Sequence, residues 1–207
     1  AAAVQLARAV EYLEALVREN PADLLARARL AYAYERAAMG AEVAGKDEQL
    51  PKAIALLEKS IATTQSLVRD DATNLLHTQK LSTRYNNAAR VRIKSGDLNG
   101  ARDYAAKGRT LVKTLLAADP RNISNTTMLS AALAMGSEIE FKSKRYDAAI
   151  ELARESIVID ARLPAETRAN LIVRENVTGA KISLGAANCA LAAQASQPAA
   201  SRGKLLK

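Results

Sequence analysis

Residues 81–120 read LSTRYNNAARVRIKSGDLNGARDYAAKGRTLVKTLLAADP, and weaker copies of this stretch precede and follow it. Leu50, Leu98 and Tyr146 follow one another at steps of 48 residues, and each begins the same pattern of small and apolar residues. In the central copy this pattern consists of Leu98, Ala101, Ala105, Gly108, Val112 and Leu115. Gaps that alternate between three and four residues place all six on one face of a helix. The stretch therefore predicts a helix–turn–helix repeat.

The other two copies keep the spacing with different residues. The earlier copy consists of Leu50, Ala53, Leu57, Ser60, Thr64 and Leu67, and the later one of Tyr146, Ala149, Ala153 and Ser156. The fourth position is small in every copy, which predicts that a neighbouring helix approaches closely there. In the last copy the apolar pattern is interrupted at Asp160.

Helix starts are marked by short polar residues. Asp23, Asn74 and Asn122 each stand at the fourth position of an exit sequence, namely NPAD, DATN and DPRN. An oxygen of such a side chain can accept a hydrogen bond from the free N–H groups of the next helix. We therefore expect an N-cap at each of these residues.

The complete pattern predicts helices at about 3–19, 22–40, 50–70, 73–95, 97–117, 122–142, 145–160 and 165–195. They form one domain over residues 1–195, with repeats at about 22–70, 73–117 and 122–160 and half a repeat at each end. The longest internal loop is expected at residues 40–48, and the seventh helix is expected to be shorter than its equivalents. Gly179 and Gly185 are expected to fray or kink the last helix, since glycine costs about 1 kcal/mol against alanine there. Residues 196–207 are expected to be a flexible basic tail.

The central copy resembles the tetratricopeptide repeat. Leu81 and Tyr85, the Gly96-Asp97 turn, the small Gly108 and the terminal Pro120 carry the resemblance. That family has a period of about 34 residues, so the helices here would each be about two turns longer. The chain departs from the family pattern in having no tryptophan and a degenerate last repeat. The resemblance implies an all-α, right-handed α-solenoid of about eight helices arranged as antiparallel pairs.

In that family the first helices of successive repeats line a concave groove that holds an extended peptide or a partner helix. Carried over position by position from Leu81 and Tyr85, the resemblance implies partner-binding residues on three helices. These are Arg29, Tyr32 and Arg36; Gln79, Lys80, Thr83, Asn86, Asn87 and Arg90; and Thr127 and Met135, beside Ala131 and Glu138. Asn86 and Asn87, with Lys80 and Arg90, have the chemistry to hold a peptide carboxylate. Packing or hydrogen bonding between helices is an equally good interpretation of the asparagine pair.

The positive charge is concentrated in the central repeat. Nine basic and two acidic residues lie between Lys80 and Lys113, a net charge of +7 out of +8 for the whole chain. A basic field of this kind attracts an acidic peptide, a phosphorylated segment or nucleic acid. The competing interpretation is a solvated surface whose long side chains cover the helices.

Residues typical of catalysis and metal binding are scarce. His77 is the only histidine, and its place near a predicted helix start favours a surface or capping role. Cys189 is the only cysteine, and we expect it to be a small buried residue of an alanine-rich helix. The chain has neither a glycine-rich phosphate loop nor an apolar run long enough to span a membrane. The sequence thus predicts a cytoplasmic binding protein that is not an enzyme and holds no cofactor.

Protein–protein recognition or scaffolding, with a peptide or an acidic partner segment in the groove, is the predicted function. Nucleic-acid binding through phosphate contacts is the alternative, although the basic repeat offers only Tyr85 and Tyr104 for base stacking. A third interpretation is a regulatory or oligomerising part of a larger bacterial signalling protein. It rests on Leu6, Ala9, Leu13 and Leu16, which match the second half of the stripe, so that the chain begins within a repeat. Exposed solenoid ends would then favour a homo-oligomer.

Overall fold

A computed structural model describes residues 2–43 and 47–196 of the chain, and these residues form helices and no strands. The helices are α1 (Ala2–Glu19), α2 (Leu24–Val43), α3 (Leu50–Asp70), α4 (Leu75–Ser95), α5 (Leu98–Ala118), α6 (Ile123–Lys142), α7 (Tyr146–Ala161), α8 (Ala165–Ala169) and α9 (Leu171–Ser196). A short 3-10 helix, η1 (Asp47–Gln49), precedes α3. The predicted all-α helical-repeat fold is confirmed. None of the described helices combines the length and the apolar character that a membrane span needs.

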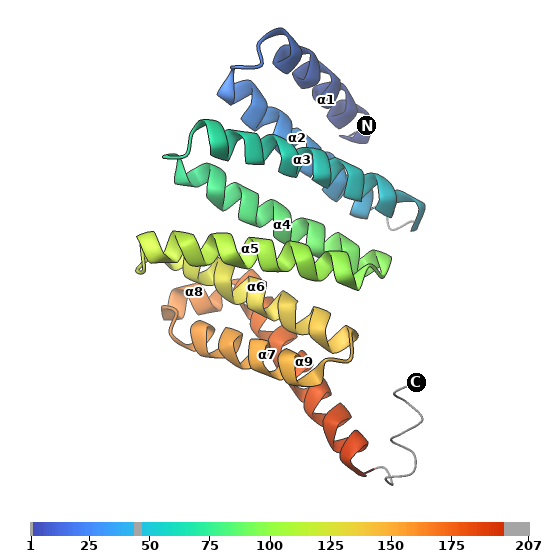
Figure 1. Ribbon diagram of the computed structural model, residues 1–207, viewed down its shortest axis with the longest axis vertical. Helices are drawn as coiled ribbons and strands as arrows, with labels where there is room; N and C mark the ends of the chain where they lie inside the picture. The colour runs from blue at the N-terminus through green and yellow to red at the C-terminus, as the bar shows by residue number, and fades with distance from the viewer. Residues whose placement is uncertain (1, 44–46, 197–207) are drawn as a thin grey trace. The chain divides into compact units, whose positions relative to one another are not determined.

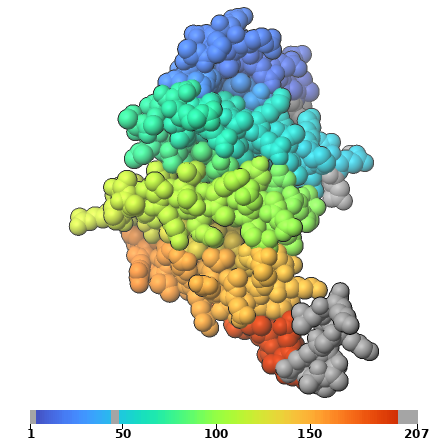
Figure 2. Space-filling model, in the orientation of Figure 1, coloured from blue at the N-terminus to red at the C-terminus, as the bar shows by residue number. Residues whose placement is uncertain are grey.

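The helices divide into two compact units, at residues 1–120 and 121–207. In the first unit α1 packs against α2, α2 against α3, α3 against α4 and α4 against α5 (Figure 1). In the second unit α6 packs against α7, and α9 packs against both. The division falls between the second and the third predicted repeat. In the space-filling view, the visible surface of the first unit changes from blue to green in the order of the chain (Figure 2).

The stripe that defines the repeat is the buried seam of each helix pair. Leu57, Val112 and Ala153 are all 0% exposed, and the small fourth-position residues Ser60 and Ser156 are fully buried as well. Removal of such apolar side chains from water is the main favourable contribution to folding. In the first unit the seam continues into a core cluster that joins α2, α3 and α4, and includes Ala38, Ile61, Leu81 and Tyr85.

The small residues of the stripe bring helix backbones into direct contact. The hydroxyl of Ser60 donates to the carbonyl of Ala31 at 2.6 Å, and that of Ser156 donates to the carbonyl of Ser130 at 3.0 Å. In the central pair the donor and the acceptor helix are exchanged, because the serine lies on α4, the first helix of the pair. The hydroxyl of Ser82 donates to the carbonyl of Gly108 on α5 at 3.0 Å. The predicted close approach at the fourth position is therefore present in all three pairs.

The predicted caps are also confirmed. Asp23 Oδ1 accepts from the N–H of Ala26 at 2.9 Å, Asn122 Oδ1 from that of Asn125 at 3.0 Å, and Asn74 Oδ1 from that of Leu76 at 3.3 Å. Gly96 ends α4 with a φ of 81°, a left-handed conformation that glycine adopts at little cost. Asp97 then caps α5 by accepting from the N–H of Gly100.

The predicted end of the second helix is wrong. The helix α2 continues past Gly40 to Val43, and Glu42 in this extra turn is paired with two basic residues of α4. The predicted loop at residues 40–48 is shorter for this reason, and its residues 44–46 lie outside the described part. The predicted tail, apart from Ser196, lies outside it too.

The last predicted helix is two helices. The chain turns at Asn170, whose ψ is 134°, and the Asn170 side chain caps α9 by accepting from the N–H of Ile172 at 2.9 Å. The helix α9 runs without interruption through Gly179 and Gly185, where the backbone faces open space and no neighbour forces a kink. As predicted, α7 is short, with 16 residues against 21 in α3 and in α5.

Cys189 is exposed, which corrects the prediction that it is buried. The buried residues of α9 are Val173, Ala180, Ser183 and Ala187. Cys189 follows Ala187 by two positions, which places it on the opposite side of a helix with 3.6 residues per turn.

Asp160 stays on the buried face of α7 although it interrupts the apolar pattern. It occupies the position that holds Thr64 and Val112 in the other repeats, and it is only 3% exposed. Neither of its carboxylate oxygens has a hydrogen-bond partner in the described part of the chain. Burial raises the pKa of the Asp160 carboxyl, and the Ser130 hydroxyl, which is engaged with Ser156, offsets this only in part.

We expect Asp160→Asn to raise the free energy of unfolding at pH 7 by about 1–3 kcal/mol, because it removes a buried charge without a partner. The raised folded-state pKa means that the parent is not penalised below the unfolded-state pKa of about 4. The penalty appears as pH rises from there through the folded-state value. Urea denaturation at pH 4 and pH 7 should thus show the gain only at the higher pH. An equal gain at both pH values would contradict this account.

Candidate functional site

The first unit contains a cleft between α2 and α4, at the place where the sequence predicts a groove. The cleft has a volume of about 430 Å³ and is lined by residues of both helices and by Leu67 of α3. Five of the predicted partner-binding residues line it: Tyr32, Arg36, Lys80, Thr83 and Asn87. A cleft thus lies between these two helices, and it contains part of the predicted groove lining.

A second cleft of about 480 Å³ lies between α1 and α2, and Arg29 lines it together with Leu6 and Leu13. Tyr32 and Arg36 line both clefts. We call the two clefts together the α2 groove, with Tyr32 and Arg36 at its centre. The second cleft exists because α1 packs against α2 as a further half repeat.

The α2 groove has one polar wall, built around Glu35. Arg84 Nη2 lies 3.4 Å from Glu35 Oε2, and the side-chain amide of Asn87 donates to Glu35 Oε1 at 2.8 Å. Arg84 is 4% exposed and also donates from Nε to Ser60 Oγ at 2.7 Å. Its pKa is lowered by burial, which the charge of Glu35 partly offsets. This network ties α2, α3 and α4 together and neutralises the acid at the groove wall.

The asparagine pair is divided between two helix contacts. Asn87 is hydrogen-bonded to Glu35 on α2, whereas Asn86 faces α5 at Gly108 and does not line the groove. The Asn86 Oδ1 atom is buried without a hydrogen-bond partner in the described residues. Both residues therefore make the helix-to-helix contacts that the sequence left as an equal alternative to ligand binding.

Arg90 is held outside the groove lining by an ion pair. Its guanidinium contacts Glu42 of α2, and Lys94 Nζ lies 2.7 Å from the same carboxylate, whose side chain is 1% exposed. Together with the Glu35 network, this second contact fixes the C-terminal turns of α2 against α4. A carboxylate clamp that included Arg90 would need this residue to leave Glu42.

Thr83 and Thr127 make hydrogen bonds within their own helices. The Thr83 hydroxyl donates to the carbonyl of Gln79 at 3.2 Å within α4, and Gln79 does not line the groove. Thr127 and Met135 lie on α6 in the second unit. The Thr127 hydroxyl donates to the carbonyl of Ile123 at 2.9 Å, and Met135 is half-buried.

Four of the predicted groove residues remain available for a partner. Tyr32 is 59% exposed, and Arg29, Arg36 and Lys80 are exposed without an ion pair in the described part of the chain. Leu76 and Met39 add apolar surface beside them. Sequence reasoning missed Leu76 and Met39 as lining residues. The helical period could have identified Leu76, which precedes Lys80 by four positions.

The basic stretch from Lys80 to Lys113 is partly neutralised. At least five of its nine cations are ion-paired in the described part of the chain: Arg84, Arg90, Arg92, Lys94 and Lys107. Three of the acids concerned, Glu35, Glu42 and Glu58, come from α2 and α3, outside the stretch. With these three acids and the two acids of the stretch itself, five negative charges stand against nine positive ones. The net charge of the stretch falls from +7 to +4.

His77 lies in the first turn of α4 and lines the groove. Its Nε2 atom is 3.3 Å from the amide nitrogen of the cap residue Asn74 and 3.7 Å from Asp71 Oδ2. The ring thus lies beside the cap. In the described residues no three or more His, Cys, Asp or Glu side chains are grouped as a metal site would need.

Comparison with known proteins gives no family for this chain. No family model and no curated protein matches it. Among solved structures it is similar to the de novo designed helical repeat protein DHR64, at 12% identity over 90% of this chain and 92% of that one, with a TM-score of 0.38. It is also similar to BtubC (BKLC) from P. vanneervenii, at 14% identity over 95% and 92% of the two chains, with a TM-score of 0.39. Both similarities are distant, and the assignment of the fold rests on the helices themselves.

Proposed function

We propose that this protein recognises another protein and holds an acidic segment of it in the α2 groove. The observation that carries the proposal is the placement of Tyr32, Arg36 and Lys80, which are exposed together along two clefts. Tyrosine and arginine are the residue types that most often contribute large binding energies at protein interfaces. In this proposal the groove binds without carrying out a reaction.

The acidic character of the partner follows from the charges that remain unpaired. Glu35 is already engaged by Arg84 and Asn87. The charges left to meet a ligand are therefore those of Arg36 and Lys80, with Arg29 in the adjoining cleft. Cations of this kind make charge-assisted hydrogen bonds to carboxylates. The apolar surface of Met39 and Leu76 suits an aliphatic or aromatic side chain between the acids.

Selection of random peptides displayed on phage against the full chain tests this proposal. We expect the selected peptides to be enriched in Asp and Glu around an apolar residue. The double variant Arg36→Glu/Lys80→Glu should weaken their binding at least about tenfold, the effect of losing roughly 1.4 kcal/mol. Fluorescence anisotropy with a labelled selected peptide measures the affinity.

The matched control is Arg109→Glu/Lys113→Glu, which changes the net charge equally on α5, away from the groove lining. It should leave peptide affinity nearly unchanged. Equal loss in both double variants would show that only the overall charge attracts the peptide. No loss in either variant would place binding elsewhere on the surface.

Nucleic acid is the second candidate, and the ion pairs of the basic stretch argue against it. Lys80, Arg109 and Lys113 are the cations of this stretch without a partner in the described part of the chain. If only these three met phosphates, the logarithm of the affinity for duplex DNA would fall with the logarithm of salt concentration with a slope of about −3. We expect no steeper slope in anisotropy titrations with a labelled duplex. A slope near −8 would show that the whole stretch binds phosphates and would favour the alternative.

A further inference from the structure

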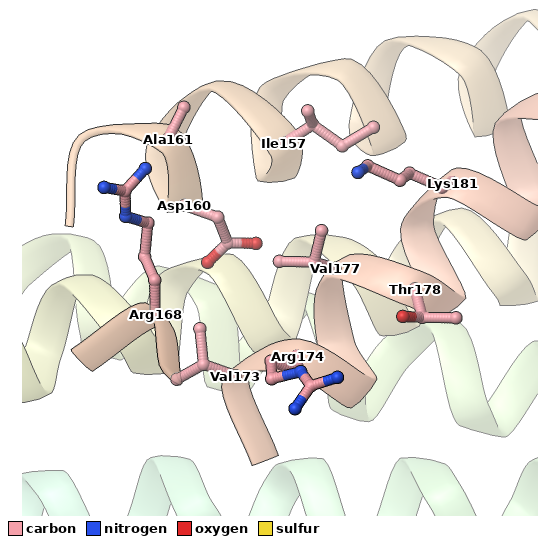
Figure 3. Close-up of a pocket in the computed structure, with 9 residues that line it drawn as sticks. All are labelled: Ile157, Asp160, Ala161, Arg168, Val173, Arg174, Val177, Thr178 and Lys181. Atoms are coloured by element: carbon pink, nitrogen blue, oxygen red, sulfur yellow. The ribbon is translucent and has the colours of Figure 1, made fainter. Parts of the chain in front are cut away.

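The buried carboxylate of Asp160 faces a cavity of about 380 Å³ in the second unit. The cavity is formed by the end of α7 together with α8 and α9 (Figure 3). Its walls are apolar at Ile157, Ala161, Val173 and Val177. We call this space the Asp160 cavity. It shares no residue with the α2 groove.

Three cationic side chains line the same cavity without pairing with Asp160. They are Arg168 of α8 and Arg174 and Lys181 of α9, and no ion pair joins any of them to the carboxylate in the structure described. Figure 3 shows the Arg168 guanidinium turned toward Ala161 and that of Arg174 turned away from Asp160. All three are exposed. The cavity thus has an acid among its innermost groups and bases at its edge.

A carboxylate in such a position is costly unless a positive group reaches it. Burial of an ionised group without hydrogen bonds costs several kcal/mol in real proteins. The equivalent positions, Thr64 and Val112, show that the repeat accepts a hydroxyl or an aliphatic side chain here. Packing of the helices therefore does not require an aspartate at position 160. An unpartnered carboxylate in the wall of a cavity is instead the arrangement expected of a site for a cationic group.

We propose that the Asp160 cavity binds a small amino acid or a similar zwitterion. Its protonated amine would donate hydrogen bonds to the Asp160 carboxylate, and its anionic group would meet the cations of Arg168, Arg174 and Lys181. A short aliphatic side chain would pack against Val173 and Val177. An anion without an amine does not fit, because Asp160 would repel it.

The volume agrees with this class of ligand. A space of about 380 Å³ lies at the small end of the usual range for ligand pockets, about 300–1,000 Å³. It would hold a single amino acid of the size of leucine with a few waters. Thr178 offers a further hydroxyl at the wall.

Three probes that share the isobutyl group of leucine test the proposal. L-Leucine carries both charges, 3-methylbutylamine has only the amine and 4-methylpentanoate has only the carboxylate. Each is titrated to about 10 mM, which detects dissociation constants in the millimolar range, into the full chain labelled with ¹⁵N. We expect leucine to shift the amide signals of residues 157–181. We expect both analogues to bind at least about tenfold more weakly, since each lacks one charge-assisted contact.

Two variants distinguish specific binding of leucine at Asp160 from a general effect of the negative charge of the protein. Asp160→Asn should abolish the response to leucine while keeping the chain folded, because the amide is nearly the same size but carries no charge. Asp147→Asn, on the exposed first turn of the same helix, is the matched control and should leave the response unchanged. Leucine should also raise the melting temperature of the parent by about 3–6 °C at tenfold excess over its dissociation constant, and not that of Asp160→Asn.

Three results would overturn the proposal. The first is no shift of these amide signals with leucine. The second is an equal response in Asp160→Asn, which would show that the carboxylate does not take part. The third is binding of 4-methylpentanoate as tight as that of leucine, which would leave the edge cations as the only contacts.

Discussion

Arg84→Ala is expected to lower the free energy of unfolding by about 3–5 kcal/mol, because it leaves a largely buried carboxylate without its cation. Arg84 is 4% exposed and is the cation that neutralises Glu35, whose side chain is 13% exposed. Its removal leaves the carboxylate with only the amide of Asn87, and it leaves Ser60 Oγ without the donor at 2.7 Å. It also opens a cavity where α2, α3 and α4 meet. Urea denaturation followed by circular dichroism measures the loss.

The double variant Arg84→Met/Glu35→Leu distinguishes a charge left unpaired from a simple loss of packing. Replacing both members of a buried ion pair with apolar residues is often neutral, whereas removing one is strongly destabilising. We therefore expect the double variant to recover at least about half of the stability lost in Arg84→Ala. Lys113→Ala, on the exposed face of α5, serves as the control and should change stability by less than about 0.5 kcal/mol. A loss below about 1 kcal/mol in Arg84→Ala would show that the network contributes little.

Gly108→Leu is expected to destabilise the first unit by about 3 kcal/mol, at the upper end of the usual cost of overpacking. A Cβ atom at Gly108 would lie 2.7 Å from Asn86 Oδ1, 3.3 Å from the carbonyl oxygen of Ser82 and 3.4 Å from Tyr85 Cβ. The asparagine can move, but the Ser82 carbonyl belongs to the backbone of α4. The larger leucine must therefore separate α4 from α5 and break the hydrogen bond from Ser82 to the Gly108 carbonyl.

Gly40 provides a matched glycine in the same unit. It lies in α2, and a Cβ added there meets nothing within 4 Å. Gly40→Ala should raise stability by up to about 1 kcal/mol, because alanine is the better helix former. Gly108→Ala, with the same intrinsic gain, should instead lower it. Thermal melts in which both alanine variants gain equally would contradict the close contact between α4 and α5.

The candidate groove could be predicted only in part. The period of the repeat and the spacing from Leu81 and Tyr85 correctly placed Tyr32, Arg36, Lys80 and Thr83 in one cleft. The same spacing also selected Asn86 and Arg90, which the structure commits to α5 and to Glu42. A repeat pattern specifies which face of a helix a residue occupies. It does not specify which distant side chain will compete for that residue.

By itself, the sequence determined the helices, their caps and the buried seam of each pair. These features are local, since a stripe spaced by three and four residues, a capping Asn or Asp and a left-handed Gly96 each act within a few residues along the chain. Only the tertiary structure decided where charge remains available. The basic stretch between Lys80 and Lys113 loses much of its field because α2 and α3 bring Glu35, Glu42 and Glu58 against it. Asp160, which the pattern showed merely as an interruption, became a buried charge facing a cavity. Electrostatic pairing depends on distance in space and on burial, and neither can be read along a single helix.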